Sequence, residues 1–485
     1  MLRDTILSSI FFIGQILISN LKTYIRILAN LTFYVLKSIF SRKPIKLQIK
    51  LDLFLAFLKE FIMTSQIKSG NVPRHLEILF DKKVSLELKG HEADLRSDFP
   101  QYQINFIRAG NISTEIFRSI GIPNNRLRFV GKDIVNSIGH AAMCLSLRKK
   151  ILDVDADLET KYLITAESKV NNNFLSYWYS FFPPFIFNSS VQIIIEREVW
   201  PFFEDINSVG TKGGVIPLLE AHDKYTRAWE NLSRDPILKL TDEHRAFGYK
   251  FLEDRNFSKI SNGRFITIHV RNSKAWVNGK LVSSSPGRNA SLDTYRKTAN
   301  HLMNLGYFVV LVGEPSNNSL ASHPQFIDYS RSKHQIDKLN TFFLAECDFL
   351  IGTNSGPICV PPCFGKRVLM TNAPSIGRSA YFTDSLVLPK MVRSGSYVLT
   401  LDEMYKTGAF WSDSDIDFQK DGSLGWLDNS EDDILEGALE MLTRPAATIS
   451  ADQERLELLL RSYGSVATGT ISKSFISKWH KNLTK

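Results

Sequence analysis

The segment Phe265–Val270, FITIHV, constrains the fold of this chain more than any other stretch of its sequence. A continuous run of mainly β-branched residues is typical of a parallel strand that is buried on both faces of a sheet. Similar runs follow at Tyr307–Val312 and Asp348–Ile351, and helical stretches separate them. Because alternating strands and helices form parallel α/β sheets, we expect a Rossmann-like unit over residues 258–445.

A second set of strand-like segments lies upstream and predicts another Rossmann-like unit over residues 71–225. A chain of 485 residues agrees with two units, because one hydrophobic core rarely grows this large. Tyr225–Phe257 has a polar, helical pattern, so we expect one interdomain helix over 226–257, and we expect a separate helical tail over 446–485. The expected strands are Val84–Leu88, Tyr102–Ile107, Leu127–Val130, Lys161–Thr165, Val191–Ile195, Gln325–Asp328 and Arg367–Met370, and the expected helices include Ile138–Leu147, Leu292–Leu305 and Ile336–Ala345.

Residues 1–70 combine apolar runs with cations. The uncharged run Thr5–Leu21 is followed by Lys22 and Arg26, then by a second apolar run, Ile27–Leu36, and a basic cluster. We expect amphipathic helices in a membrane interface, because their apolar faces can enter the acyl chains while the cations meet anionic headgroups. A single spanning helix, a helical hairpin packed on the body and a cleaved signal peptide are the alternatives. The basic cluster comprises Lys37, Arg42, Lys43, Lys46 and Lys50.

The charge balance favours an anionic partner. The net charge is +9 and the pI is about 9.1, which suits a phosphorylated substrate, an acidic membrane or nucleic acid. Nucleic-acid sites interleave cations with aromatics in the folded body, whereas many cations here stand among the apolar N-terminal runs, so we expect a membrane and no nucleic acid. The four cysteines form neither a disulfide framework nor a zinc pattern, which indicates a reducing compartment.

The turn Gly352-Thr353-Asn354-Ser355-Gly356-Pro357 follows the predicted strand DFLI. In open α/β sheets, ligands bind outside the carboxyl ends of the strands. A glycine-rich turn there lets backbone N–H groups approach an anion, and the next helix N-terminus adds partial positive charge. Asn354 and Ser355 would add side-chain donors. An ordinary capped turn is the alternative.

His269 and Arg271 stand at the end of the strand FITIHV and face the same side, because side chains alternate along a strand. An arginine at a strand tip suits bidentate contact with a phosphate. Arg288 and Asn289 follow a polar loop, where binding residues concentrate. A surface ion pair and a solvated loop are the alternative interpretations of these two features.

Signals for a metal or a cofactor are weak. Asp153-Val154-Asp155 and Asp413-Ser414-Asp415 match the D-x-D pattern of a metal-binding pair, but neither ends a central strand. Gly356 and the later Gly365-Lys366-Arg367 lack the spacing and the hydroxyl residue of a P-loop. We therefore expect no metal and no cofactor.

Residues 125–445 resemble a bacterial family of predicted glycosyltransferases found with surface-polysaccharide genes. That family has a strand ending H-V-R, then R-N, a strand ending in glycine, I-D-Y, C-x-F-x-I-G-T-x-S-G and T-N. The combination of H-V-R with G-T-x-S is also similar to fucosyltransferases that use GDP-fucose, and the S-G-P turn is similar to heptosyltransferases. Glu314 departs from the family, which more often has aspartate near that place. The matching pieces are His269–Arg271, Arg288–Asn289, Gly313, Ile327–Tyr329, Cys347–Gly356 and Thr371–Asn372.

The resemblance implies a GT-B fold, with two Rossmann-like domains preceded here by the helical, membrane-associating segment of residues 1–70. It also implies a transferase that needs no bound metal and offsets the charge of the leaving diphosphate with cations and helix N-termini. His140, in the turn SIGH of the first domain, is the first candidate for the general base, and His269 is the second. The expected donor-binding residues are Arg271, Arg288, Asn289, Gly313, Glu314, Asn354, Ser355 and Gly356.

We therefore expect a glycosyltransferase that moves a sugar from a nucleotide sugar to a glycan or lipid-linked acceptor in surface-polysaccharide synthesis. We expect it to lie peripherally on the cytoplasmic face of the bacterial inner membrane, because reduced cysteines and excess cations both favour that side. The alternative is a non-catalytic, membrane-associated glycan-binding or scaffold protein on the same fold.

Overall fold

The computed structural model describes residues 127–484, apart from 167, 169–171, 185–202, 213, 233–234, 256, 258–262, 273, 278–279, 284–285, 316–318, 333–334, 379–383, 413–423 and 446–447. Within these residues no helix is long and apolar enough to cross a membrane. The membrane-associating segment of residues 1–70 and the strands expected at 84–88, 102–107 and 191–195 lie outside the described residues.

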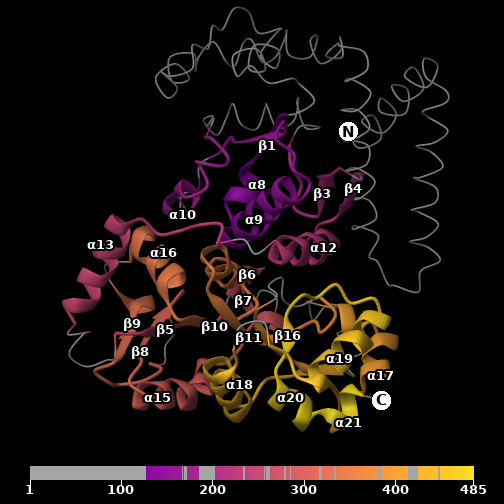
Figure 1. Ribbon diagram of the computed structural model, residues 1–485. Coiled ribbons are helices and arrows are strands. Elements are labelled where there is room, and N and C mark those ends of the chain that lie inside the picture. The colour runs from indigo at the N-terminus through magenta and orange to yellow at the C-terminus, as the bar shows by residue number, and fades with distance from the viewer. Residues whose placement is uncertain are drawn as a thin grey trace, which may run out of the picture.

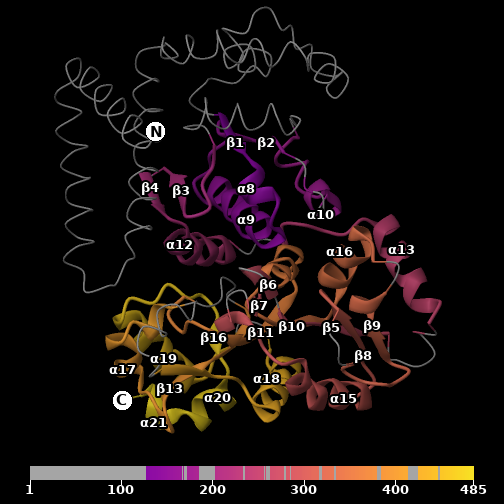
Figure 2. The same ribbon diagram turned by 180° about the vertical axis from the view of Figure 1, so that it is seen from behind.

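The described chain forms two units, one above the other in Figure 1 and in the reverse view of Figure 2. The first unit runs from β1 (Leu127–Val130) through α12 (Leu218–Asn231). The second unit runs from α13 (Asp242–Glu253) to α21 (His480–Leu483).

The second unit is built on a seven-stranded sheet in which every neighbouring pair of strands is parallel. The strand order is β16-β12-β11-β10-β5-β8-β9. The chain begins at β5, moves outward through β8 and β9, returns to β10 beside β5 and then moves outward on the other side, as in a doubly wound Rossmann sheet. These strands are β5 (Phe265–His269), β8 (Phe308–Val312), β9 (Phe326–Asp328), β10 (Phe349–Thr353), β11 (Arg367–Ala373), β12 (Leu386–Pro389) and β16 (Thr470–Ile471), which confirms the five strands expected here.

The two faces of this sheet bury different cores, because side chains alternate along each strand. In β8, Phe308, Val310 and Val312 enter one core, and Val309 and Leu311 enter the other. Helices cover both faces of the sheet, so the prediction of a Rossmann-like unit in the second part of the chain is confirmed. The first core includes residues of α13 and of α16 (Asp337–Glu346), and the second includes residues of α15 (Arg296–Asn304), α17 (Leu401–Lys406), α18 (Glu431–Thr443), α19 (Ala451–Ser462) and α20 (Lys473–Lys478).

The first unit also contains parallel strands. β1 pairs in parallel with β2 (Lys161–Ile164), and isolated bridges to Phe203 and Pro184 extend this pair on either side. The strands expected at Leu127–Val130 and Lys161–Thr165 are therefore confirmed, as is the helix expected from Ile138. The remaining elements are α8 (Lys132–Val135), α9 (Ile138–Val154), α10 (Asn172–Ser176) and the hairpin of β3 (Ser208–Thr211) and β4 (Gly214–Pro217).

Two helices, α12 and α13, occupy the place where we expected one interdomain helix over 226–257. The helix α12 packs on α9 of the first unit, and α13 packs on α16 of the second. The chain crosses between the units at residues 232–241, where the Leu238 N–H donates to the Cys363 carbonyl oxygen at 2.9 Å. Pro236 lies in this crossing and cannot continue a helix. The expectation of a single helix is therefore wrong.

The residues that we expected to form a separate tail, 446–485, belong to the second unit. β16 pairs with β12, and Leu456 and Phe475 enter the second core. α19 also ties this region to the first unit, because the Arg461 guanidinium donates to both Asp223 carboxylate oxygens, at 2.5 and 2.8 Å. The boundary expected at 445 is therefore wrong, since the tail completes the sheet.

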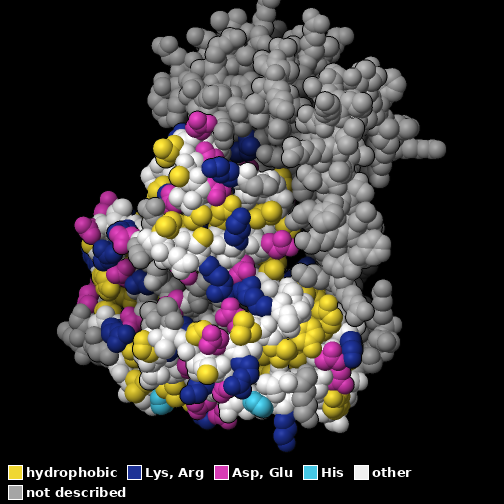
Figure 3. Space-filling view, turned by 45° about the vertical axis from the view of Figure 1, so that its right-hand side comes forward, with side chains coloured by type: hydrophobic (Ala, Val, Ile, Leu, Met, Phe, Trp, Pro, Cys, Tyr) yellow, Lys and Arg dark blue, Asp and Glu magenta, His cyan; other side chains and the backbone are white. Residues whose placement is uncertain are grey.

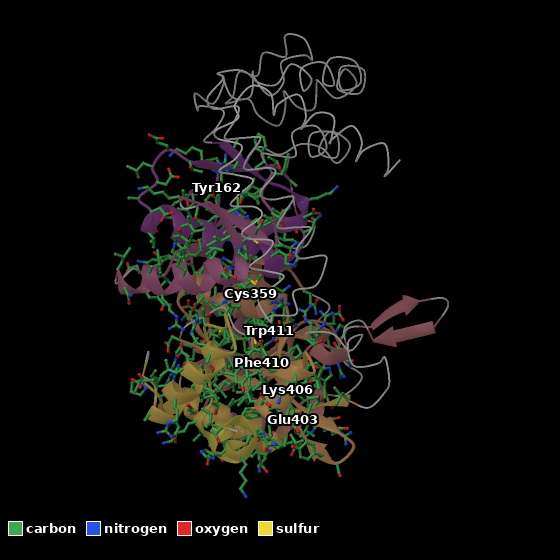
Figure 4. The ribbon with its side chains drawn as sticks, turned by 90° about the vertical axis from the view of Figure 1, so that its right-hand side faces the viewer. Tyr162, Cys359, Glu403, Lys406, Phe410 and Trp411 are labelled. Atoms are coloured by element: carbon green, nitrogen blue, oxygen red, sulfur yellow. The ribbon has the colours of Figure 1, made fainter. Side chains whose placement is uncertain are left out.

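Besides the hairpin of β3 and β4, two small antiparallel sheets of the second unit lie outside the sequence-based expectations. β6 (Lys274–Val277) and β7 (Lys280–Ser283) form a hairpin in a region that we read as a polar loop. This hairpin projects from the body (Figure 4). β13 (Met391–Ser394) pairs with β14 (Tyr397–Val398) on one side and with β15 (Leu424–Leu427) on the other.

The two units meet where α9 approaches the end of β10. A Cβ atom added to Gly139 of α9 would lie 2.6 Å from the Cα atom of Gly356, which begins the short helix η8 (Gly356–Cys359). Only glycine allows two backbones to come this close. Cys359 is buried at this junction (Figure 4), and a single hydrophobic core contains residues of both units.

Replacing Gly139 with alanine should destabilise the protein by about 1–3 kcal/mol, because the added methyl group meets backbone atoms that cannot rotate away. Chemical denaturation would measure this loss. Gly425→Ala is the matched control, since a Cβ atom there meets nothing within 4 Å. Equal stability of Gly139→Ala and the wild type would show that the units do not depend on this contact.

Candidate functional site

A cavity of about 340 Å³ lies at the carboxyl ends of β5, β8 and β10. β5 is the strand from which the chain moves outward in both directions, so the cavity occupies the switch point of the sheet, where doubly wound proteins bind ligands. Six of the ten residues that we predicted for the site line this cavity. They are His269, Arg271, Gly313, Glu314, Ser355 and Gly356.

Arg271 is held at the end of β5 by its backbone. Its N–H donates to Thr353 Oγ1 at 2.8 Å, and its carbonyl oxygen accepts from the Ala290 N–H at 3.1 Å. These bonds join the end of β5 to the end of β10 and to the segment that follows Arg288. The local structure therefore fixes the point from which the Arg271 side chain leaves the sheet.

The charges around Arg271 favour an anionic ligand. Partial burial lowers the pKa of Arg271, the nearby charge of Arg288 lowers it further, and Glu314 opposes this effect. Arg288 itself donates through Nε to the Asn354 carbonyl oxygen at 3.0 Å. A phosphate in the cavity would offset the repulsion that Arg271 experiences from Arg288 and would accept charge-assisted hydrogen bonds.

His269 is a neutral imidazole at the base of the cavity. Burial lowers its pKa from an ordinary 6.5 to about 4. Its Nδ1 lies 3.3 Å from the Val312 carbonyl oxygen, which can only accept, so Nδ1 carries the proton. Gly313 makes room for this ring, because its φ is +113° and a Cβ atom there would lie 2.7 Å from His269 Nδ1.

The first unit reaches the cavity through the beginning of α9. Ile138 lines the cavity, and Ser137 is the N-cap of the helix. The N-terminus of a helix carries partial positive charge, so α9 adds to the electropositive character of this end of the cavity. The contact between Gly139 and Gly356 brings the beginning of α9 to the cavity.

The structure places the other four predicted residues around the cavity but not in its lining. His140 lies on the first turn of α9, and its Nδ1 is 3.1 Å from the Asp133 carbonyl oxygen. The Asn289 carbonyl oxygen accepts from Lys390 Nζ at 2.8 Å, and Asn354 is contacted by Arg288.

Besides Asn272, three polar residues that the sequence did not indicate also line the cavity: Gln335, Asp337 and Asn340. Asp337 Oδ2 accepts from the Asn173 N–H of the first unit at 2.6 Å. Burial raises the pKa of Asp337, and this hydrogen bond opposes the effect. The only available sequence signal was their position at the start of a predicted helix that follows the I-D-Y segment.

The D-x-D pair of the first unit takes part in packing contacts. Asp153 accepts from Lys149 Nζ at 2.5 Å and from Trp229 Nε1 at 3.1 Å. Asp155 accepts from the Tyr225 hydroxyl at 3.1 Å. The second pair, Asp413 and Asp415, lies outside the described residues. Within the described part of the chain, no three His, Cys, Asp or Glu side chains gather as a metal site would require.

Comparisons with solved structures find glycosyltransferases. The chain is similar to the ADP-heptose LPS heptosyltransferase II of E. coli, with 11% identity, a TM-score of 0.39, and coverage of 65% of this chain and 98% of that chain. It is also similar to a family 9 glycosyl transferase from Veillonella parvula, with 15% identity, a TM-score of 0.35, and coverage of 66% and 98%. A third is the E. coli heptosyltransferase WaaC with ADP, with 10% identity, a TM-score of 0.30, and coverage of 54% and 90%.

No family model matches the chain. A search of curated proteins also finds no match.

The buried neutral state of His269 should make stability depend on pH. The pKa is about 4 in the folded protein and about 6.5 when unfolded, so the unfolded chain binds more protons between these values. Stability is then complete above pH 6.5 and falls as the pH drops toward 4. Between pH 7 and pH 5 this group should account for about 2 kcal/mol. Urea denaturation of the wild type and of His269→Gln at both pH values would measure it, and an equal loss in both proteins would refute it.

Proposed function

We propose that this chain is a glycosyltransferase that uses a nucleotide-sugar donor, with the donor diphosphate beside Arg271. The observation that carries the proposal is the cavity at the switch point, where Arg271 and the Ser355–Gly356 turn face the first turn of α9. A diphosphate needs cations and N–H donors at close range, and this cavity brings Arg271 of the second unit together with the N-terminus of α9 of the first unit.

The proposed reaction is displacement at the anomeric carbon of the donor. A hydroxyl oxygen of the acceptor forms a bond to that carbon, the bond from the carbon to the diphosphate oxygen breaks, and a base receives the hydroxyl proton. Negative charge grows on the leaving diphosphate during this step. Arg271, Arg288 and the helix N-terminus would stabilise this charge electrostatically, so we propose that the reaction needs no divalent metal.

Three residues are candidates for the general base, and their contacts and pKa values distinguish them. A pKa of about 4 makes His269 a weak base at neutral pH, and its unprotonated nitrogen better suits accepting a hydrogen bond from the donor. His140 lies on the first unit but outside the cavity lining, with one ring nitrogen beside Asp133. Asp337 lines the cavity, has a raised pKa and keeps one oxygen without a partner among the described residues. We therefore add Asp337 to His140 and His269.

The acceptor would enter from the first unit, opposite the donor. We propose a glycan or a lipid-linked acceptor of surface-polysaccharide synthesis, and a peripheral position on the cytoplasmic face of the inner membrane. The support is the alternation of apolar runs and cations over residues 1–70. An enzyme held on the membrane in this way would meet a lipid-linked acceptor at high local concentration.

Arg271→Ala should weaken the binding of a nucleotide sugar about ten- to hundredfold, because it removes a charge-assisted contact worth about 1.5–3 kcal/mol. Calorimetric titration with UDP-, GDP-, CMP- and ADP-sugars in excess EDTA would first find the donor and then measure the loss. Arg264→Ala is the matched control, since Arg264 lies at the other end of β5 in an ion pair with Asp348.

Unchanged affinity in Arg271→Ala would refute the assignment of the donor site. Binding without turnover on any acceptor would instead favour the non-catalytic glycan-binding protein. Turnover that stops in EDTA and returns with manganese would contradict a metal-independent reaction.

Full-length protein should sediment with vesicles that contain anionic lipid and stay in solution with purely zwitterionic vesicles. Each cation near the surface contributes about 1 kcal/mol to this binding. Replacing Arg42, Lys43 and Lys46 with glutamine should therefore release most of the protein. Resistance of the full-length protein to high salt and alkaline carbonate would show a spanning segment and overturn the peripheral arrangement.

A further inference from the structure

A second cavity, of about 620 Å³, lies at the opposite edge of the seven-stranded sheet. Arg367 and Thr470, which line it, are the first residues of β11 and β16, and Ser385 immediately precedes β12. Because all strands of this sheet are parallel, their amino ends lie on the edge away from the donor cavity. We call this space the amino-edge cavity, and a ligand bound in it would not overlap the donor.

Both units contribute walls to the amino-edge cavity. Lys150 comes from α9, and Thr226 and Trp229 come from α12 of the first unit. Pro236 and Ile237 come from the crossing between the units. The remaining walls belong to the second unit, so the cavity lies across the junction. Figure 3 shows Lys and Arg side chains gathered along this junction.

Cations outnumber carboxylates in the amino-edge cavity. Two of its cations are neutralised by ion pairs, Arg227 with Glu457 at 2.6 Å and Arg444 with Asp384 at 2.9 Å. Three other cations have no carboxylate partner among the described residues. The cations in the lining are Lys150, Arg227, Lys366, Arg367 and Arg444, and the carboxylates are Glu230, Asp384 and Glu457.

The three cations without a carboxylate partner bond only to neutral groups. Lys150 Nζ donates to Thr226 Oγ1 at 3.2 Å and lies 5.6 Å from the centre of the Trp229 ring. Lys366 Nζ donates to the Glu346 carbonyl oxygen at 3.4 Å. The Arg367 guanidinium donates to the carbonyl oxygens of Arg444 and Met441, at 3.0 and 2.8 Å. Burial lowers the pKa of Lys150, and the nearby charge of Glu230 only partly opposes this effect, so the ammonium group lacks full solvation.

Arg444 is a further sign of an incomplete site. Its side chain is only 6% exposed, and its Nε has no hydrogen-bond partner among the described residues. Burial lowers the pKa of this guanidinium as well. Leaving a buried donor unbonded costs about 1–3 kcal/mol, and the cost is larger near a charge.

We propose that the amino-edge cavity binds a small phosphate-bearing anion. Its volume falls within the range of small-molecule sites. Lys150 approaches from α9, and the neighbouring residues Lys366 and Arg367 approach from the start of β11. The Thr226 hydroxyl and the Trp229 ring offer contacts to an uncharged part of the ligand. Phosphate groups would neutralise the three cations without disturbing the two ion pairs.

Occupation of the amino-edge cavity would also stabilise the arrangement of the two units. α9 lines both cavities, the donor cavity through Ile138 and the amino-edge cavity through Lys150. Lys150 follows Ile138 by twelve positions in the helix, which is about 18 Å along the helix axis. A ligand that binds both units favours the state in which their walls are together, and this is the state that also completes the donor cavity.

The test uses inorganic diphosphate as the probe and full-length protein. The Arg271→Ala background weakens diphosphate binding in the donor cavity, so calorimetric titration there reports mainly the second site. We expect binding to persist in Arg271→Ala and to weaken at least tenfold when Lys150→Gln and Lys366→Gln are added. Lys406→Gln is the matched control, because this exposed lysine of α17 lies far from Cys359 and the junction (Figure 4).

Trp229 provides a second measurement that does not depend on the stability of the double variant. Diphosphate should change the tryptophan fluorescence of Arg271→Ala, and Trp229→Phe should abolish this change while keeping the affinity within a few fold. Absence of diphosphate binding in Arg271→Ala, or binding that is unchanged by the lysine substitutions, would overturn the proposal. Either result leaves the donor site untouched, since that site is judged by nucleotide-sugar binding to the wild type.

Discussion

The approach of Gly139 to Gly356 is the contact on which the remaining structure depends. Both residues are glycines and carry no Cβ atom, so their backbones lie closer together than any other pair of residues would permit. This contact sets the distance between the two units. The beginning of α9 then lies at the end of β10, so the helix N-terminus, the Ser355–Gly356 turn and Arg271 border the same cavity. Packing therefore brings the partial positive charge of the α9 N-terminus next to the Arg271 cation.

This arrangement explains why the sequence predicted one half of the site better than the other. His269, Arg271, Gly313 and Ser355 stand at strand ends, and parallel topology alone brings such residues to one edge of a sheet. Their positions follow from local patterns and from the order of the strands. To predict where His140 lies relative to the cavity, one must know the distance between the two units. The sequence of neither unit indicates that distance. Asp337 and Gln335 were missed for the same reason, because only tertiary packing turns the start of α16 toward the cavity.

The errors in the fold have more local causes. Asn278-Gly279 lies between two alternating segments and is a strong hairpin signal, so β6 and β7 could have been predicted. Pro236 could likewise have divided the interdomain helix. The strand β16 is different, because Thr470 and Ile471 carry no periodic pattern, and their pairing with β12 depends on residues far apart in the chain. Buried apolar runs such as β5 and β8 were the most reliable predictions, since a short β-branched run that is buried on both faces has few alternatives to a parallel strand.

The late position of β16 in the sequence has a consequence for synthesis of the protein. β12 emerges from the ribosome with one edge unpaired, and β16 follows only after α17, α18 and α19. An open edge is a template for pairing with other chains, so nascent protein is exposed to aggregation throughout that interval. Once β16 docks, the sheet ends in a strand of two residues, too short to recruit another. Ribosome pausing between these elements should therefore prolong the vulnerable state and increase the demand for chaperones.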